Sequence, residues 1–167
     1  MHEMDVRTTV NGRPLEARLP MRLLLVDFLR DRLGLTGTKV SCGMQVCGTC
    51  TVLVDDQPVS SCTYLACDVD GRTVTTVEGL AERGTLSPVQ KAFVDCSALQ
   101  CGFCTSGFVV SATALLRENK RPTEQDVAHY LEGNLCRCTG YLPIIEAVMS
   151  AAQSRVRGCT ENPHDQN

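Results

Sequence analysis

Two cysteines separated by a single residue, Cys136 and Cys138, could direct both of their sulfurs at one inorganic group. Thiols so close along the chain do not ordinarily form a disulfide with each other, but a sharp turn can bring them to a common ligand. Gly133 and Gly140 lie on either side of the pair and permit such a turn. A two-sulfur site of this kind needs further ligands. A second closely spaced pair lies upstream, at Cys101 and Cys104.

A separate group of four cysteines has the spacing C-x4-C-x2-C, with the fourth cysteine after eleven further residues. We call this group the loop site; its members are Cys42, Cys47, Cys50 and Cys62. The spacing matches plant-type [2Fe–2S] proteins, in which one loop supplies three thiolates and a neighbouring strand supplies the fourth. Gly43 and Gly48 allow backbone N–H groups to point inward at an anionic cluster.

The first group, which we call the bundle site, consists of Cys101, Cys104, Cys136 and Cys138. Each pair precedes a predicted helix, one starting at Ser106 and the other near Leu142. Helix N-termini have unsatisfied N–H groups and a positive dipole end, which favour thiolates and anions. Two such ends would hold a second iron–sulfur cluster. Zinc is the alternative at both sites, but structural zinc usually has paired C-x2-4-C ligands, and a C-x-C pair is unusual for it.

The composition argues against nucleic-acid binding and against a disulfide-stabilised secreted protein. The net charge is −3, from 16 basic and 19 acidic residues, so no basic surface is indicated, and Trp is absent. The 11 cysteines are odd in number and clustered rather than dispersed. Residues 1–10 lack the apolar segment of a signal peptide, and the apolar residues 21–29 are too few to span a membrane. We expect a soluble, cytoplasmic protein.

The first half of the chain has the pattern of a small sheet with one helix. Residues 6–10 and 15–19 alternate between apolar and polar side chains around a predicted Asn11-Gly12 turn. Residues 22–33 repeat apolar side chains at helical spacing. Further strands are predicted at residues 51–54, 59–62 and 73–77. This order indicates an α+β domain with the helix across one face of the sheet.

The second half is predicted to be helical throughout. Its first helix opens with Ser87 as the N-cap, proline at the next position and Gln90 at the third. Three more helices are predicted at residues 106–119, from a cap at Thr123 through Leu131, and from Leu142 to Ala152. Together the four helices would form a small bundle.

Several stretches resemble one known family. Residues 100–105, which read Gln-Cys-Gly-Phe-Cys-Thr, and residues 133–141, which read Gly-Asn-Leu-Cys-Arg-Cys-Thr-Gly-Tyr, follow a plant-type loop. In this order they are similar to the small iron–sulfur subunits of the xanthine oxidase family of molybdenum hydroxylases. That family includes carbon monoxide dehydrogenases, aldehyde oxidoreductases and N-heteroaromatic hydroxylases. The resemblance covers residues 5 to about 153.

The resemblance implies an N-terminal β-grasp, plant-type ferredoxin-like domain over residues 1–79. An all-α four-helix bundle would follow over residues 80–156, and then a polar tail over residues 157–167. The loop site would hold the distal [2Fe–2S] cluster, nearer a flavin, and the bundle site the proximal [2Fe–2S] cluster. Gln100 and Cys138 would also contact the pterin of a molybdenum cofactor in a partner subunit. The alternative for Gln100 is a solvent-exposed or capping side chain before a tight loop.

On this resemblance the chain is an electron-transfer subunit without a substrate pocket of its own. A molybdenum partner would hydroxylate the substrate with oxygen from water, and electrons would leave singly through the proximal and then the distal cluster. The implied partners are a large molybdenum-cofactor subunit and a medium FAD subunit, in a dimer of heterotrimers. The alternatives are a free-standing two-cluster ferredoxin and a zinc-stabilised interaction module.

Three positions depart from the family pattern. Ser41 and Gln45 stand where glycine is usual, and Ser106 stands where proline is usual. None of these changes removes a sulfur, so they bear on loop conformation and on the hydrogen bonds that help to set a reduction potential. The cysteines outside both sites are Cys67, Cys96 and Cys159. Buried cysteine commonly acts as a small apolar residue, which is our expectation for Cys67 and Cys96, whereas we expect Cys159 to be exposed in the tail.

Overall fold

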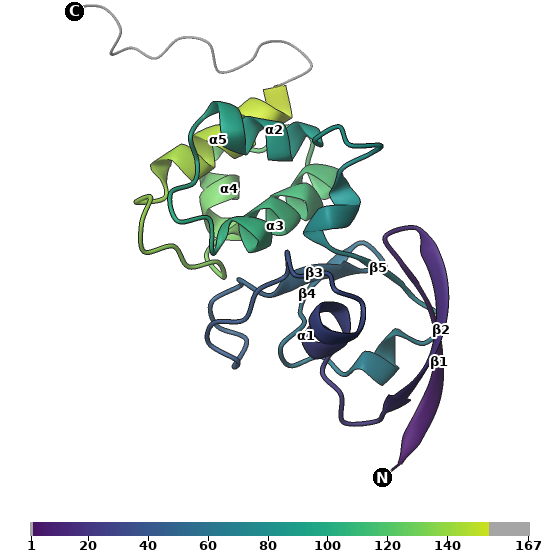
Figure 1. Ribbon diagram of the computed structural model, residues 1–167. Helices are drawn as coiled ribbons and strands as arrows, with labels where there is room; N and C mark the ends of the chain where they lie inside the picture. Colours follow the sequence, from purple (N-terminus) through teal and green to yellow (C-terminus); the bar gives the residue numbers. More distant parts are fainter. Residues whose placement is uncertain (1, 154–167) are drawn as a thin grey trace, which may run out of the picture.

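The computed structural model describes residues 2–153 of the chain, as a five-stranded sheet followed by a group of helices (Figure 1). The strand order in the sheet is β2-β1-β5-β3-β4. Four of the helices, all from the second half of the chain, gather on the side of the sheet where β3 and β4 lie (Figure 1). The predicted α+β fold, a ferredoxin-like β-grasp followed by four helices, is therefore confirmed. The predicted tail at residues 157–167 lies outside the described residues.

The β1–β2 hairpin forms as the alternating pattern predicts. Strand β1 (Glu3–Val10) pairs antiparallel with β2 (Arg13–Pro20). Asn11 and Gly12 join them with φ values of 51° and 76°, and this left-handed pair matches the twist of the two strands. The apolar side chains that face inward belong to one core under the sheet; they include Val6, Val10 and Leu19.

The helix predicted over residues 22–33 is shorter than its apolar pattern indicates. It begins as α1 (Leu25–Asp27) and continues as a π-helical turn, η1 (Phe28–Arg32). Leu24 is still extended and forms an isolated bridge with Leu65, so the chain is held in a strand-like conformation until that point. Periodicity alone does not report such a pairing, because it involves a residue distant in sequence. The buried residues of the helix are Leu25, Val26, Phe28 and Leu29.

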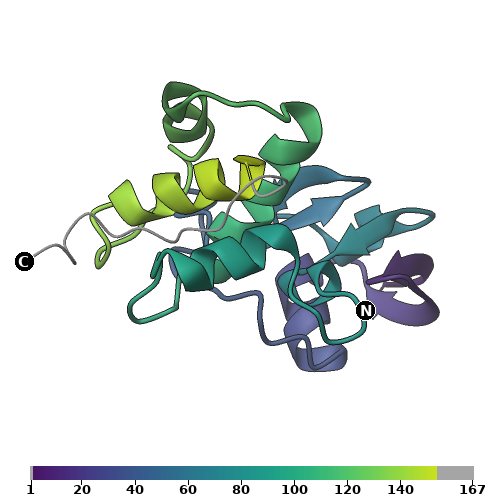
Figure 2. The same ribbon diagram turned by 90° about the horizontal axis from the view of Figure 1, so that it is seen from above.

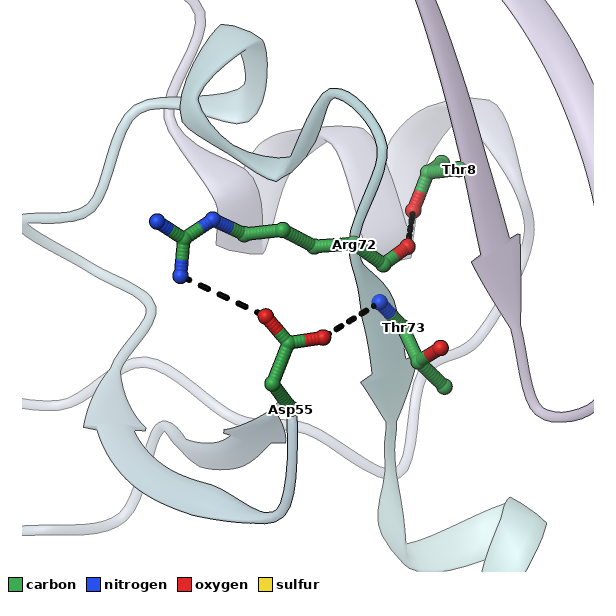
Figure 3. A network of polar contacts seen from close by, with 4 residues as sticks. All are labelled: Thr8, Asp55, Arg72 and Thr73. Carbon is green, nitrogen blue, oxygen red and sulfur yellow. Dashed lines mark hydrogen bonds and ion pairs between the residues drawn. The ribbon is translucent and has the colours of Figure 1, made fainter.

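Three shorter strands complete the sheet: β3 (Thr51–Val54), β4 (Gln57–Ser60) and β5 (Thr73–Thr75). A polar network ties the β3–β4 turn to β5 and β1 (Figure 3). The Asp55 carboxylate accepts a bond of 2.9 Å from the Thr73 backbone N–H and one of 3.4 Å from Arg72 Nη1. The Thr8 hydroxyl donates to the Arg72 carbonyl at 2.8 Å. The two 3₁₀ turns of this half are η2 (Ala66–Val69) and η3 (Val77–Leu80).

The four predicted helices of the second half are all present. They are α2 (Pro88–Asp95), α3 (Thr105–Glu118), α4 (Glu124–Tyr130) and α5 (Leu142–Gln153). Both predicted caps form: Ser87 with Gln90 opens α2, and Thr123 with Asp126 opens α4, each as a reciprocal capping box. Helices α2 and α5 lie side by side (Figure 2). No helix within residues 2–153 is long and apolar enough to cross a membrane.

The sheet and the helices share one close backbone contact. A Cβ placed on Gly107, in the first turn of α3, would lie 2.2 Å from the carbonyl oxygen of Gly48, in the loop-site loop. The Asn134 side chain donates to the same Gly48 oxygen at 3.1 Å, and this bond is buried. Leu53 of β3 belongs to the helical core, and Arg117 of α3 forms an ion pair with Asp56. The two halves are therefore packed against each other directly.

We expect Gly107→Ala to destabilise the chain, because the added methyl group would collide with backbone rather than with a movable side chain. The cost should be about 1–3 kcal/mol, as for other overpacked positions. Denaturant unfolding of the purified full chain measures it. Gly133→Ala is the matched control, since a Cβ there meets nothing within 4 Å. Equal unfolding free energies for the two variants would contradict the close contact.

Candidate metal centres

The loop site is built from one long loop and the end of a hairpin. The loop between η1 and β3 carries Cys42, Cys47 and Cys50, and Cys62 follows β4. Cys50 and Cys62 are buried together with Val26 of α1. Cys47 is also buried, whereas Cys42 is only partly covered. The structure thus brings the four predicted residues to one place, with Cys42 toward solvent.

The bundle site is built from two loops that flank helices. Cys101 lies before α3, and Cys104 is the N-cap residue of that helix. Cys136 and Cys138 lie in the loop between α4 and α5. Cys101 and Cys138 are exposed, whereas Cys104 and Cys136 are partly buried. One edge of the site therefore faces outward, and the other faces the helical core.

In both sites the thiols are arranged as two pairs. Cys101 Sγ lies 3.6 Å from Cys138 Sγ, and the Cys104 thiol contacts that of Cys136. In the loop site the contacting pairs are Cys42 with Cys47 and Cys50 with Cys62.

This pairing suits a two-iron cluster, in which each iron takes two cysteine thiolates. A structural zinc ion instead needs four ligands arranged tetrahedrally around one point. The donor set and its geometry therefore fit a [2Fe–2S] cluster at each site better than the zinc alternative.

Backbone N–H groups favour the thiolate at the open end of the loop site. Met44 N and Val46 N each lie 3.4 Å from Cys42 Sγ. These bonds, with a further contribution from Cys47, lower the pKa of Cys42 to about 6. At the buried end, desolvation raises the pKa of Cys50 to about 11. The Cys42 thiol, on the outer side, is therefore readily ionised by the loop alone. The Cys50 thiol, on the inner side, needs a nearby cation to make its ionisation favourable.

The bundle site shows the same contrast with different donors. Burial alone would raise the pKa of Cys136, but the Thr139 hydroxyl at 3.1 Å and the N–H groups of Thr139 and Cys138 at 3.4 Å outweigh it. The resulting pKa of Cys136 is about 7. Desolvation, followed by the neighbouring Cys136, raises the pKa of Cys104 to about 12.

These donors correct one sequence expectation. We expected the N-terminus of the helix after Cys138 to support the second pair, but the groups that contact Cys136 belong to the loop itself. Several residues separate Cys138 from the start of α5, so the loop turns back on its own sulfur before the helix begins. Cys104 occupies the N-cap position of α3, but its side chain makes no capping hydrogen bond there, and burial raises the pKa of its thiol.

Tyr141 is a supporting residue that sequence reasoning did not identify. Its phenol oxygen accepts a bond of 3.1 Å from the Cys136 backbone N–H, and its own N–H donates to Thr139 Oγ1 at 3.3 Å. Its backbone has a φ of 71°, which is unusual for a residue other than glycine. Its ring lies edge-on to that of Phe108, with centroids 6.3 Å apart. In the sequence, its role was indicated only by its position at the end of residues 133–141, which contain Cys136 and Cys138.

Exposed apolar side chains lie close in the sequence to the bundle-site cysteines. We call them the bundle-site surface; they are Leu99, Phe103, Leu135, Tyr141 and Leu142. Gln100 is also exposed and lies directly before Cys101. Isolated apolar residues are normal on a protein surface, but a group around a metal site indicates contact with another molecule.

Cys67, Cys96 and His129 are not among the proposed cluster ligands. Cys67 packs against the core under the sheet, and its thiol lies 3.5 Å from the Met21 carbonyl oxygen. Cys96 packs against the helical core as expected. His129 pairs with Glu132 on an exposed helix face. Cys159 lies outside the described residues.

The contrasting pKa values predict which thiols react first in the cluster-free chain. Thiolates are the reactive form, so iodoacetamide at pH 7 should label Cys42 and Cys136 well before Cys50 and Cys104. Labelling should fall as the pH drops through about 7 for Cys136 and about 6 for Cys42. Peptide mass spectrometry after timed labelling measures this order. Equal rates at all four positions would contradict it.

Tyr141→Phe should disturb one site only. The variant keeps the ring beside Phe108 but leaves the Cys136 N–H without its acceptor, which costs about 1 kcal/mol. We expect a changed electron paramagnetic resonance (EPR) signal from the bundle-site cluster and an unchanged signal from the loop-site cluster. Phe108→Leu is the control, because it alters the ring contact and keeps the hydroxyl. If both signals changed together in Tyr141→Phe, the local role of the hydroxyl would be disproved.

Two family profiles match the chain and between them cover most of it. The 2Fe-2S iron-sulfur cluster binding domain matches residues 8–81, and the [2Fe-2S] binding domain matches residues 76–149. The first match contains the whole loop site and the second the whole bundle site. The chain therefore has two [2Fe–2S] binding domains.

Similar proteins extend over almost the whole chain. The nicotine 6-hydroxylase small subunit of Paenarthrobacter nicotinovorans is 52% identical over 149 residues, covering 89% of this chain and 88% of that protein. The aldehyde oxidoreductase of Megalodesulfovibrio gigas is 45% identical over 147 residues, which are 86% of this chain but only 16% of that protein.

A solved structure agrees with these relatives in fold as well as in sequence. Quinoline 2-oxidoreductase from Pseudomonas putida 86 superposes with a TM-score of 0.88 at 43% identity, covering 91% of this chain and 95% of the matched chain. Coverage of more than nine-tenths of both chains at this level of identity establishes the family as well as the fold. The chain belongs to the small iron–sulfur subunits of the xanthine oxidase family of molybdenum hydroxylases.

Proposed function

We propose that this chain passes electrons between a molybdenum-cofactor subunit and a flavin or other acceptor, as part of a multi-subunit oxidoreductase. Each [2Fe–2S] cluster, when bound, accepts and releases one electron at a time. The proposed ligands are the four loop-site cysteines and the four bundle-site cysteines. The role of the chain is to hold the two sites at a set distance and to shield them from water.

One observation carries this proposal: a backbone hydrogen bond joins the two sites. The Leu135 N–H donates to the Cys47 carbonyl oxygen at 2.9 Å. Cys47 belongs to the loop site, and Leu135 is bonded directly to Cys136 of the bundle site. The neighbouring Asn134 bond to Gly48 is buried, so water does not separate the segments there. A short protein route between two one-electron centres is what an electron-transfer subunit requires.

The bundle-site surface is the proposed contact with the large molybdenum subunit. It places the exposed Cys101 and Cys138 within an apolar border, and Gln100 lies beside them. We infer that Gln100 and Cys138 contact the pterin of the molybdenum cofactor, as the family pattern implies. A free-standing ferredoxin would leave this apolar surface in water, which is unfavourable, and the relatives are parts of larger enzymes.

The wider assembly follows from the family. We propose a medium FAD subunit near the loop site and a dimer of heterotrimers overall, in the cytoplasm. A cytoplasmic location fits eight thiols that must remain reduced to bind iron. We also propose a domain division at residues 79 and 80, between the last strand of the sheet and the first helix of the bundle.

The substrate of the complex is not encoded in these residues. Identity is 45% both to a 6-hydroxypseudooxynicotine dehydrogenase subunit and to an aldehyde oxidoreductase, two enzymes named for chemically different substrates. This subunit is proposed to contact clusters and partner subunits but not the substrate. Its sequence is therefore expected to be similar among enzymes that act on different substrates. The choice of substrate is therefore assigned to the partner.

Metal analysis and EPR test the proposed function. The purified full chain should contain about four irons, and after reduction it should show two distinct [2Fe–2S] signals. Each signal should disappear selectively when a ligand of its own site is changed, with Cys62→Ser for the loop site and Cys104→Ser for the bundle site. Zinc in place of iron, or one signal in place of two, would disprove the assignment.

Cys138→Ser tests the direction of electron entry in the assembled enzyme. Because Cys138 is exposed beside the proposed partner contact, its loss should reduce turnover strongly, while the loop-site signal after chemical reduction should persist. Cys67→Ser is the control, since that thiol lies outside both sites. Equal loss of both EPR signals in Cys138→Ser would contradict separate sites.

A further inference from the structure

Gln45 occupies a backbone conformation that favours glycine. Its φ is 62°, in the left-handed region, where a side chain is strained and glycine is not. The conformation is required by the sulfur next to it. Met44 N and Val46 N, on either side of Gln45, both point at Cys42 Sγ. Glycine would form the same loop with less strain, so the Gln45 side chain is accommodated here at a cost.

The Gln45 side chain makes a bond that glycine cannot make. Its Oε1 accepts a hydrogen bond of 3.1 Å from the Thr63 hydroxyl. Thr63 directly follows Cys62, whereas Gln45 lies between Cys42 and Cys47. The bond thus connects the segment that carries one thiol pair to the segment that carries a member of the other pair.

This bond lies on the side of the loop site that water can reach. Gln45 and Thr63 are both exposed, and they line a groove of about 670 Å³ together with Ser60, Tyr64 and Asn134. Met44 and Val46, the neighbours of Gln45, are 67% and 56% exposed. Little apolar packing therefore holds this part of the loop, so a side-chain bond can determine how often it opens.

We propose that Gln45 and Thr63 form a latch that keeps the outer part of the loop site closed over its cluster. Gln45 acts as a positioning residue, holding the Cys42 segment against the Cys62 segment. When the bond breaks, the loop can move away from the hairpin and expose the Cys42 and Cys47 side of the site. The latch thus limits loss of the loop-site cluster, and the bundle site is not involved. This inference depends on the proposed function only in requiring a cluster at the loop site.

The test compares Gln45→Gly, Thr63→Val and the double variant in the full chain loaded with both clusters. An iron chelator is added, and the loss of each cluster is followed separately by EPR after reduction of timed samples. Either single variant should lose the loop-site cluster about threefold to tenfold faster, the factor expected for one hydrogen bond. Bundle-site loss, measured in the same samples, serves as the internal control.

Two further readouts separate a latch from general destabilisation. Gln45→Gly relieves the left-handed strain, so its thermal unfolding midpoint should stay the same or rise while cluster loss accelerates. The Thr63 hydroxyl is shared with the Ser60 carbonyl oxygen at 3.2 Å, so Thr63→Val removes that contact as well as the bond to Gln45. The double variant should therefore lose the cluster no faster than Thr63→Val alone.

The latch is disproved if Gln45→Gly retains the loop-site cluster as long as the unmodified chain or longer. It is also disproved if the two substitutions act additively, or if both clusters are lost faster together. Absence of iron from the loop site of the unmodified chain would instead refute the proposed function. The two failures are therefore distinguishable.

Discussion

The contact between Gly48 and the helical half is the constraint on which both metal sites depend. Gly48 lies between Cys47 and Cys50. A Cβ at Gly107 would collide with the Gly48 carbonyl oxygen, and a Cβ at Gly48 would collide with the Gly133 carbonyl oxygen and the Asn134 side chain. Asn134 and Leu135 directly precede Cys136. One buried backbone contact therefore positions a loop-site ligand segment and a bundle-site ligand segment together. A shift of the helices relative to the sheet would alter both sites and the distance between them.

Within each site the protein distributes hydrogen bonds unequally. One thiol, Cys42 or Cys136, receives several donors and has a lowered pKa, whereas a buried thiol, Cys50 or Cys104, has a raised one. An iron–sulfur core resolves this imbalance, because its cations make the buried thiolates favourable. Hydrogen bonds to sulfur also shift reduction potentials. The two loops therefore affect both how tightly each cluster is bound and the reduction potential of that cluster. The two sites use different donors, N–H groups flanking Gln45 in one and Thr139 in the other.

Much of this arrangement could be predicted from the sequence. Cysteine spacing indicated both groups of four, and the capping residues at Ser87 and Thr123 indicated where two helices begin. The local patterns failed where distant contacts decide the conformation. The first helix starts late because Leu24 pairs with Leu65, and the support of Cys136 comes from a loop that folds back on itself. The approach of Gly48 to Gly107 also depends on the tertiary packing, which no spacing rule describes.

The central claim is that two clusters lie in one rigid unit, connected through the Cys47 to Leu135 bond. EPR of the fully reduced chain at low temperature tests it most directly, because two nearby paramagnetic centres interact magnetically. We predict that the two signals are split or broadened when both clusters are reduced, and that the splitting disappears in the Cys104→Ser variant. Two sharp signals that simply add, with a loop-site signal that keeps the same shape when the bundle-site cluster is removed, would contradict the account.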